Sequence, residues 1–247
     1  MRSCPVSAIT FLILIALIGS IGAEGNKLQV LRGWGEVIDP DRDCHFSLTN
    51  GKLTISIPGT VHGLAVERGN MSAPRVLQEV SGDFVAQVEV SGAFAPGATS
   101  LVSERRAFQA AGLLLWQDSR NYVRLERAQL GVEGQTMTYA SFELRSNGQI
   151  ARFANASEHP LPGNVTLLKL ERHGHKVSAS VSSDGVQWTS LEPMVVHFSK
   201  TVRVGVAAGH NTSTPLTAEF ERFTLTPAAE ASGSETNSTS SARGSRH

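Results

Sequence analysis

Residues 112–127, GLLLWQDSRNYVRLER, decide the fold class. An apolar run at 112–116 is followed by the polar turn Asp118-Ser119-Arg120-Asn121, and from Tyr122 onward polar and apolar residues alternate. Successive side chains of a strand point to opposite faces, so Val123 and Leu125 should face the core and Tyr122, Arg124 and Glu126 the other side. The stretch predicts two antiparallel strands joined by a short turn.

The same period of two recurs through residues 26–227. Lys52–Ile57, for example, places Leu53, Ile55 and Ile57 on one face. Further strands are predicted at 75–80, 83–90, 112–116, 122–127, 135–144, 149–153, 165–172, 176–182, 202–208 and 218–225, with turns at Asn50-Gly51, Ser81-Gly82, Asn147-Gly148 and Asp184-Gly185. No helix of three turns is expected, and the pattern predicts an all-β, antiparallel two-sheet jelly-roll sandwich. The loop at 94–108 should project from its rim.

The N-terminal segment has the three parts of a secretory signal peptide in the usual order. An uncharged apolar run at 9–21 follows Arg2 and leads into the small residues Gly22 and Ala23. The run is shorter than the ~20 residues of a membrane span. We therefore predict a signal peptide over residues 1–23, with retention as an anchor as the alternative, and a secreted or periplasmic product without stable membrane insertion after cleavage.

The C-terminal segment should be disordered. Residues 228–247 contain no Val, Ile, Leu, Met or aromatic residue, so they cannot bury enough apolar surface to offset the entropy of ordering. The sandwich domain is thus expected over residues 24–227.

Composition excludes several classes of protein. Lys+Arg and Asp+Glu both number 22, so no net field gathers nucleic acid, and no such partner is expected. Cys4 should be removed when the signal peptide is cleaved. Cys44 alone cannot form a disulfide framework or a cysteine-based zinc site. The eight histidines do not form a ligand set, and there is no Gly-x-Ser-x-Gly elbow, phosphate loop or dinucleotide fingerprint.

The face that carries Tyr122, Arg124 and Glu126 has two interpretations. With Trp116 on the same face, it would offer an aromatic platform beside charged hydrogen-bonding groups, as a sugar ring requires. Alternatively, the aromatic residues are packing, and Arg124 and Glu126 pair with Glu143 and Arg145 on the neighbouring strand. The residues alone support the two interpretations equally.

Glu126 and Glu143 are the carboxylates that can be placed on adjacent strands. They are therefore the candidates for the acid and the nucleophile of a glycosidase, which needs two carboxyl groups close together. Their flanking arginines argue against catalysis, because a guanidinium lowers the pKa of a carboxyl group and a general acid needs it raised.

Asp39, Asp41 and Asp43 look like the start of a calcium loop. Cys44 and Asn50, however, stand where an EF-hand needs glycine and a bidentate glutamate. A solvated acidic turn before a strand at 45–48 is favoured, and calcium bound in another geometry is the alternative. No other cofactor is expected.

Six motifs in order resemble one family: GKLTISIPG, APRVLQEVSGDFVAQVEV, AGLLLWQDSRNYVRLER, LKLERHGHKVSASVSSDGVQWTSL, VRVGVAA and FERFTL. Together, over residues 43–225, they resemble uncharacterised domains named after a fungal regulator of enolase, in the concanavalin A-like lectin/glucanase superfamily. They are also similar to the C-terminal sandwich domain of some β-xylosidases.

This resemblance implies a concanavalin A-like jelly roll from a superfamily that binds or cleaves polysaccharides on one concave sheet face. The resemblance implies no particular active site, because the family has no assigned activity. The Glu-x-Asp-x-x-Glu strand of the glucanases is absent, and Glu219-Phe220-Glu221 is the nearest run. GLLLW and NYVRLE match the family's most recognisable stretch. With the neighbouring strand added, the predicted ligand-binding residues are Trp116, Asp118, Asn121, Tyr122, Arg124, Glu126, Glu143 and Arg145.

The sequence thus favours an exported, non-catalytic sandwich domain whose partner is a polysaccharide or glycan. A glycoside hydrolase or related polysaccharide-active enzyme is the first alternative, and a structural or protein-interaction domain is the second.

Overall fold

The computed structural model describes residues 28–132 and 134–228. The predicted signal peptide and, except for Ala228, the predicted tail lie outside the described residues. Within them, the strands in chain order are β1 (Val30–Leu31), β2 (Gly35–Ile38), β3 (His45–Thr49), β4 (Lys52–Ile57), β5 (Arg75–Ser81), β6 (Phe84–Ala93), β7 (Phe108–Asp118), β8 (Asn121–Val132), β9 (Gln135–Ser146), β10 (Gln149–Arg152), β11 (Thr166–His173), β12 (Lys176–Ser182), β13 (Thr189–Val195), β14 (Thr201–His210) and β15 (Leu216–Pro227). A 3-10 helix, η1 (Val66–Arg68), lies between β4 and β5.

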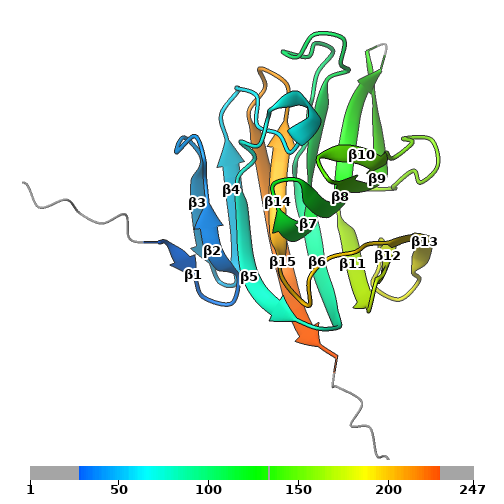
Figure 1. Ribbon diagram of the computed structural model, residues 1–247. Helices are drawn as coiled ribbons and strands as arrows, with labels where there is room; N and C mark the ends of the chain where they lie inside the picture. Colours follow the sequence, from blue (N-terminus) through cyan, green and yellow to red (C-terminus); the bar gives the residue numbers. More distant parts are fainter. Residues whose placement is uncertain (1–27, 133, 229–247) are drawn as a thin grey trace, which may run out of the picture.

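These strands form two stacked sheets, with all neighbours antiparallel (Figure 1). One sheet has the order β1-β2-β5-β14-β7-β8-β9-β10, and the other has the order β13-β12-β11-β6-β15-β4-β3. The predicted all-β jelly-roll sandwich is confirmed. Among the described residues, no helix has the length and hydropathy that a membrane crossing needs.

The predicted turns explain how the hairpins close. Asn50 and Gly51 have φ values of 51° and 85°, and Asn147 and Gly148 have values of 52° and 79°. Asn and Gly tolerate this left-handed region better than other residues, which is why Asn-Gly pairs favour two-residue hairpins. Sequence reasoning missed β1, β2 and β13, which are short or lie near a sheet edge, where β13 accommodates Pro193.

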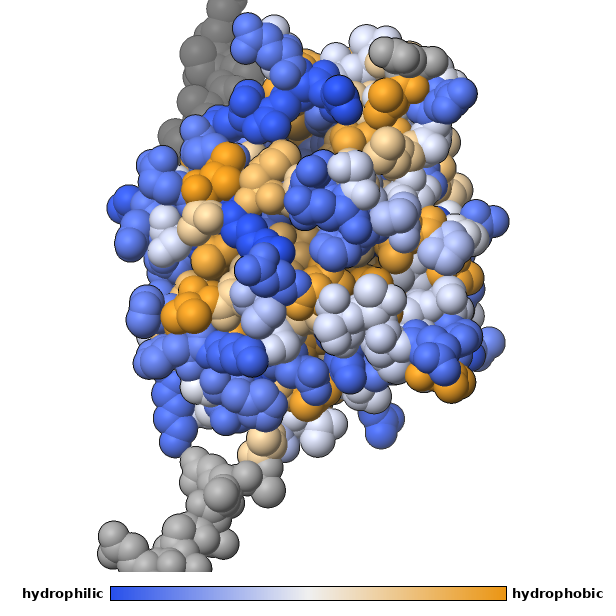
Figure 2. All heavy atoms as spheres, turned by 90° about the vertical axis from the view of Figure 1, so that its right-hand side faces the viewer, coloured by the Kyte–Doolittle hydropathy of each residue, from blue (hydrophilic) through white to orange (hydrophobic). Residues whose placement is uncertain are grey.

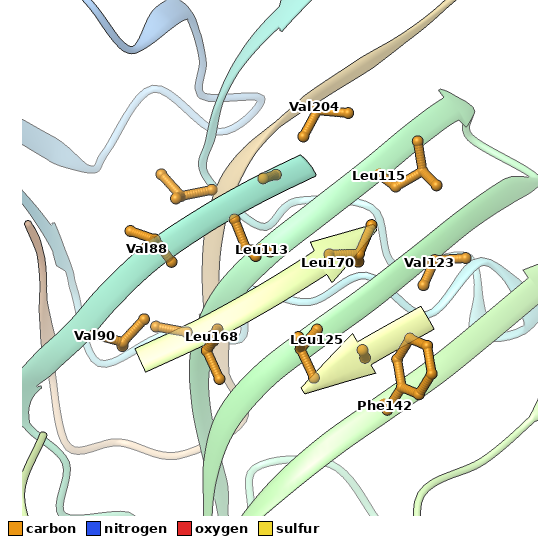
Figure 3. Close-up of a cluster of buried hydrophobic side chains, with 14 of the residues drawn as sticks. Val88, Val90, Leu113, Leu115, Val123, Leu125, Phe142, Leu168, Leu170 and Val204 are labelled. Atoms are coloured by element: carbon orange, nitrogen blue, oxygen red, sulfur yellow. The ribbon is translucent and has the colours of Figure 1, made fainter. Parts of the chain in front are cut away.

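The main core lies between the two sheets (Figure 3). Leu113, Leu115, Val123, Leu125, Phe142 and Val204 of the eight-stranded sheet face Val88, Val90, Leu168 and Leu170 of the other, and all belong to one buried cluster. Full burial of one such side chain stabilises the fold by about 1.5–3 kcal/mol. The alternation read from the sequence places these residues correctly.

A further layer covers the outer face of the eight-stranded sheet. We call residues 58–73, which include η1, the cover segment; Figure 1 shows it in cyan in front of the sheet. Its Leu64 and Ala73 pack on Leu114 and Tyr122 of the sheet in a second buried cluster. The outer face is therefore not open to solvent where the cover segment lies.

Backbone pairing fixes one end of the cover segment. The amide of His62 donates to the carbonyl oxygen of His210 at 2.9 Å, and the amide of His210 donates back to His62 at 2.7 Å. A Cβ added to Gly209 would lie 2.6 Å from the carbonyl oxygen of His62, so glycine is what permits this close approach.

Candidate functional site

A cavity of about 820 Å³ lies over the outer face of the eight-stranded sheet. Its floor comes from β8 and β9, and its walls come from the cover segment and from the loops that precede β7 and follow β10. The lining includes Glu67, Arg105, Arg106, Phe108, Arg124, Glu126, Tyr139, Glu143, Arg145, Phe153 and Asn155. The loop before β7, which the sequence placed at the rim, thus forms one wall. The volume is in the range of pockets that hold small ligands.

Strand register puts the charged floor residues on one face. Arg124 of β8 pairs directly with Glu143 of β9, and Tyr122 pairs with Arg145. Glu126 is two positions along β8 from Arg124 and therefore shares its face. The structure brings Arg124, Glu126, Glu143 and Arg145 to one face, and Arg124 with Glu143 forms the cross-strand pair that was the alternative to an open platform.

The buried carboxylate of Glu143 is held by two arginines. Its Oε2 atom accepts hydrogen bonds from Nη2 of Arg124 and, at 3.1 Å, from Nη1 of Arg145. Burial alone would raise the pKa of Glu143, but the two guanidinium groups outweigh burial and lower it. Glu143 is therefore an ionised carboxylate with fixed donors around it.

Arg145 continues the network to the cover segment. Its Nε and Nη2 atoms donate to the two carboxylate oxygens of Glu67 at 3.0 Å and 3.3 Å. Glu67 lies in η1, so this forked ion pair ties the cover segment to the floor of the cavity. We call Arg124, Glu143, Arg145 and Glu67 the ion chain.

Glu126 is the exception among the floor carboxylates. Its Oε1 atom is 3.7 Å from Nη1 of Arg124, and its Oε2 atom is buried without a hydrogen-bond partner. Burial is the largest influence, the charge of Glu143 acts in the same direction, and together they raise the pKa of Glu126 despite Arg124 and Arg145. The arginines lower the pKa of both carboxyl groups as expected, but only at Glu143 do they outweigh burial.

Trp116 and Tyr122 do not form an open platform. Their rings stack at a centroid distance of 5.5 Å, and the guanidinium carbon of Arg75 lies 4.6 Å from the centroid of the Trp116 ring. Tyr122 is 0% exposed beneath the cover segment, and neither residue lines the cavity. Of the two interpretations, packing is the one that the structure shows for Tyr122, and sequence periodicity could not decide between them because it does not show that another segment covers this face.

Asp118 and Asn121 shape the β7–β8 hairpin. Oδ1 of Asp118 accepts hydrogen bonds from the amide of Arg120 at 2.7 Å and from Nδ2 of Asn121 at 3.0 Å. Oδ1 of Asn121 accepts from the amide of Asn147 at 2.9 Å, which joins this turn to the β9–β10 turn. Both residues lie outside the cavity lining, and these contacts account for their positions as turn residues.

Sequence reasoning missed several lining residues. Glu67 lies in the cover segment, which shows neither strand nor helix periodicity, and Phe153 and Asn155 follow the short strand β10. Phe153 is 57% exposed and stands at the cavity with Arg105, whose guanidinium carbon is 6.0 Å from its ring centroid. Sequence reasoning placed Phe153 at the end of a strand at 149–153, whereas β10 ends at Arg152 and leaves Phe153 in the loop.

The Asp39–Asp43 turn does not gather its three carboxylates on one point. Asp39 accepts hydrogen bonds from the amides of Arg42 and Cys44, at 3.2 Å and 3.0 Å, and so closes its own turn. Asp43 instead contacts the buried His62 of the cover segment at 2.9 Å. Burial opposes ionisation of Asp43, but hydrogen bonding with His62 and Cys44 lowers its pKa.

Polar and apolar residues are mixed on one side of the molecule. Figure 2 shows the side of the molecule on the right of Figure 1, where hydrophobic residues form small patches separated by hydrophilic ones. The cavity combines its charged floor with the aromatic residues Phe108, Tyr139 and Phe153. Such a site can donate to and accept from a polar ligand while it packs against an apolar ring face.

The fold and site define a two-sheet sandwich with a charged cavity on the outer face of one sheet. Over residues 62–228 the sequence matches the family described as "Protein of unknown function (DUF1349)", and the chain belongs to this family. No curated protein matches the sequence.

Solved structures with this fold include a functionally unknown protein from Saccharomyces cerevisiae, with a TM-score of 0.60 at 18% identity over 79% of this chain and 97% of that one. The GH43 protein BlXynB from Bacillus licheniformis has a TM-score of 0.50 at 14% identity over 78% of this chain and 39% of that one. A carbohydrate binding module, CBM66 from Bacillus subtilis, has a TM-score of 0.48 at 12% identity over 80% of this chain and 99% of that one. At these identities the likeness shows the fold alone.

Replacing the two floor glutamates should change stability in opposite directions at neutral pH. The lowered pKa of Glu143 means that its contribution is present above the unfolded value of ~4.3 and is lost as pH falls through the folded value. The raised pKa of Glu126 means that its contribution is present at low pH and is lost as pH rises through the folded value.

Glu143→Gln, which removes the hydrogen-bonded carboxylate of the largely buried Arg124 and leaves Arg145 with Glu67 alone, should therefore cost about 3–5 kcal/mol at pH 7. Glu126→Gln should raise the free energy of unfolding at pH 7, and more so there than at pH 4. Urea unfolding of both variants and the wild type across this pH range is the measurement. Equal losses for the two variants would contradict the assignment.

Proposed function

We propose that this protein is an exported, non-catalytic sandwich domain that binds a glycan in the cavity over β8 and β9. The observation that carries the proposal is the cavity of about 820 Å³ with buried, oriented arginine and glutamate side chains in its floor. The predicted signal peptide supports export to a secreted or periplasmic location, where the protein would encounter polysaccharides.

The chemistry of the lining supports a sugar as the ligand. Sugar hydroxyls both donate and accept, and the ion chain offers guanidinium donors beside carboxylate acceptors whose positions are fixed by one another. Phe153 at the rim and Tyr139 in the floor offer ring faces for the apolar side of a pyranose. The relation to domains named after a fungal regulator of enolase stays a prediction, and it adds no ligand.

The site differs from the one that the sequence suggested. Arg124, Glu126, Glu143 and Arg145 are retained as ligand-binding residues, since all four line the cavity. Trp116 and Tyr122 stack on each other beside the cavity floor, and Asp118 and Asn121 stabilise the turn of the β7–β8 hairpin. Phe153 takes the aromatic role that was expected of Trp116.

Phe153→Ala should weaken glycan binding by about tenfold, the effect of losing ~1.4 kcal/mol of ring contact. The side chain is exposed, so its truncation should leave the fold intact. Binding of the purified protein to a panel of neutral and acidic oligosaccharides, measured by calorimetry, is the experiment.

Ile150→Ala is the matched control, because Ile150 is an exposed apolar residue of β10 that does not line the cavity. It should bind as the wild type does. An equal loss in the control, or a panel without any saturable binding, would refute the proposed site.

A second candidate function, glycoside hydrolysis, is favoured by one observation. Glu126 combines a raised pKa with a buried, unpartnered Oε2 atom in the cavity, as a general acid requires, while the neighbouring Glu143 stays ionised. Against it stands the engagement of Glu143 with two arginines, which occupies the carboxylate that would have to act as nucleophile or base.

If the protein hydrolyses a glycan, Glu126→Gln should reduce release of reducing sugar by about 10²–10⁴-fold, the contribution of a positioned general acid. The variant should still bind the glycan, since glutamine keeps the shape of the side chain. Hydrolysis that continues at the wild-type rate in Glu126→Gln would remove Glu126 from that role, and absence of hydrolysis in the wild type leaves binding as the function.

A further inference from the structure

A second group of chemically reactive side chains lies away from the cavity floor, where the start of β3 meets the cover segment. One ligand atom each from Asp43, Cys44 and His62 lies within 4.8 Å of the others. Asp41 adds a carboxylate, whose Oδ2 atom is 3.8 Å from Nε2 of His62. The group unites an imidazole, a thiol and two carboxylates.

His62 is oriented as a metal ligand usually is. Its side chain is 1% exposed, and its Nδ1 atom lies 3.0 Å from the carbonyl oxygen of Thr60, to which it can only donate. This bond directs Nε2 toward Asp43, 2.9 Å away. A backbone carbonyl on the far ring nitrogen is the arrangement that fixes the tautomer and ring direction of metal-bound histidines.

With the proton on Nδ1, that geometry suits a positive centre between His62 and the carboxylates. With Nδ1 as the donor, Nε2 of a neutral imidazole presents a lone pair to the carboxylate oxygens of Asp43 and Asp41. Two acceptors facing each other are held together either by a second proton on the ring or by a cation that both coordinate. Cys44 favours the cation, because its Sγ atom lies 3.5 Å from Oδ1 of Asp43 and cysteine sulfur is a strong ligand for a metal once it has lost its proton.

We propose that Asp43, Cys44 and His62, with Asp41 as fourth ligand, bind a divalent transition metal of the zinc class. Zinc takes sulfur, imidazole nitrogen and carboxylate oxygen in four-coordinate sites, whereas calcium takes oxygen ligands only. The ion acts as a structural clip that joins the start of β3 to the cover segment, and so fixes the wall of the cavity at His62.

The proposal replaces the calcium alternative at the same turn. Asp39 is committed to the amides of Arg42 and Cys44, so it shapes the turn without being a ligand. The sequence excluded a zinc site built from cysteines, and a mixed site was missed because His62 is distant in the chain. The fold brings it to Asp43 through the His62–His210 backbone pairing.

The test uses the reduced protein after removal of metals with EDTA and dialysis. Titration with Co²⁺ reports sulfur ligation through the thiolate-to-cobalt charge-transfer band, and competition with a chromogenic chelator gives the affinity for Zn²⁺. We expect one metal per chain with the charge-transfer band, and a higher melting temperature with Zn²⁺ but not with Ca²⁺. Cys44→Ser should abolish the band, and Asp43→Asn should weaken Zn²⁺ binding by more than about 10-fold, the loss seen even for outer-shell partners.

His175→Gln is the matched control, because the His175 and His197 rings also lie close together, at 5.1 Å. It should keep the band and the affinity. The proposal is overturned if the wild type binds no Co²⁺ with a sulfur band, if Cys44→Ser retains it, or if Ca²⁺ raises the melting temperature as Zn²⁺ does. Loss of binding in His175→Gln alone would move the metal to that other pair and also overturn it.

Discussion

A carboxylate buried between two guanidinium groups is the interaction on which the outer face depends. Glu143 can stay ionised away from water only because Arg124 and Arg145 surround it, and Arg145 in turn needs Glu67 from the cover segment. Removing one member leaves an unpaired buried charge, which costs more than the intact group contributes. The ion chain therefore obliges the cover segment to sit where it does, and the cavity is the space left between them.

Strand β8 links the ion chain to the core of the sandwich. Val123 and Leu125 are fully buried between the sheets, while Arg124 and Glu126, at the alternate positions, face the cavity. A shift of one residue in register would exchange the two sets and bury arginine in an apolar core. The same packing that stabilises the sandwich thus sets the position of the polar groups, so the floor of the cavity rests on a rigid sheet rather than on loops.

The sequence predicted what strand periodicity controls. The alternation in residues 122–127 gave the faces of Arg124 and Glu126 correctly, and the pairing with Glu143 and Arg145 followed from adjacent strands. It left open whether Tyr122 is packed or exposed and did not predict the contribution of Glu67, because the cover segment has no period that shows where it packs. Likewise, Asp39, Asp41 and Asp43 are close in sequence, but their partners are decided by His62, which the fold brings in from a separate segment.

The central claim is that the ion chain holds the cover segment over the sheet and so forms the cavity. Amide hydrogen exchange on the Glu67→Gln variant tests it most directly, with the amides of Ala65, Gly69 and Ala73 as reporters, since their hydrogen bonds lie within the cover segment. The account predicts faster exchange at these amides than in the wild type, and unchanged exchange in β6 and β11 of the opposite sheet. Unchanged exchange in the cover segment, or equal acceleration throughout the sandwich, would contradict it.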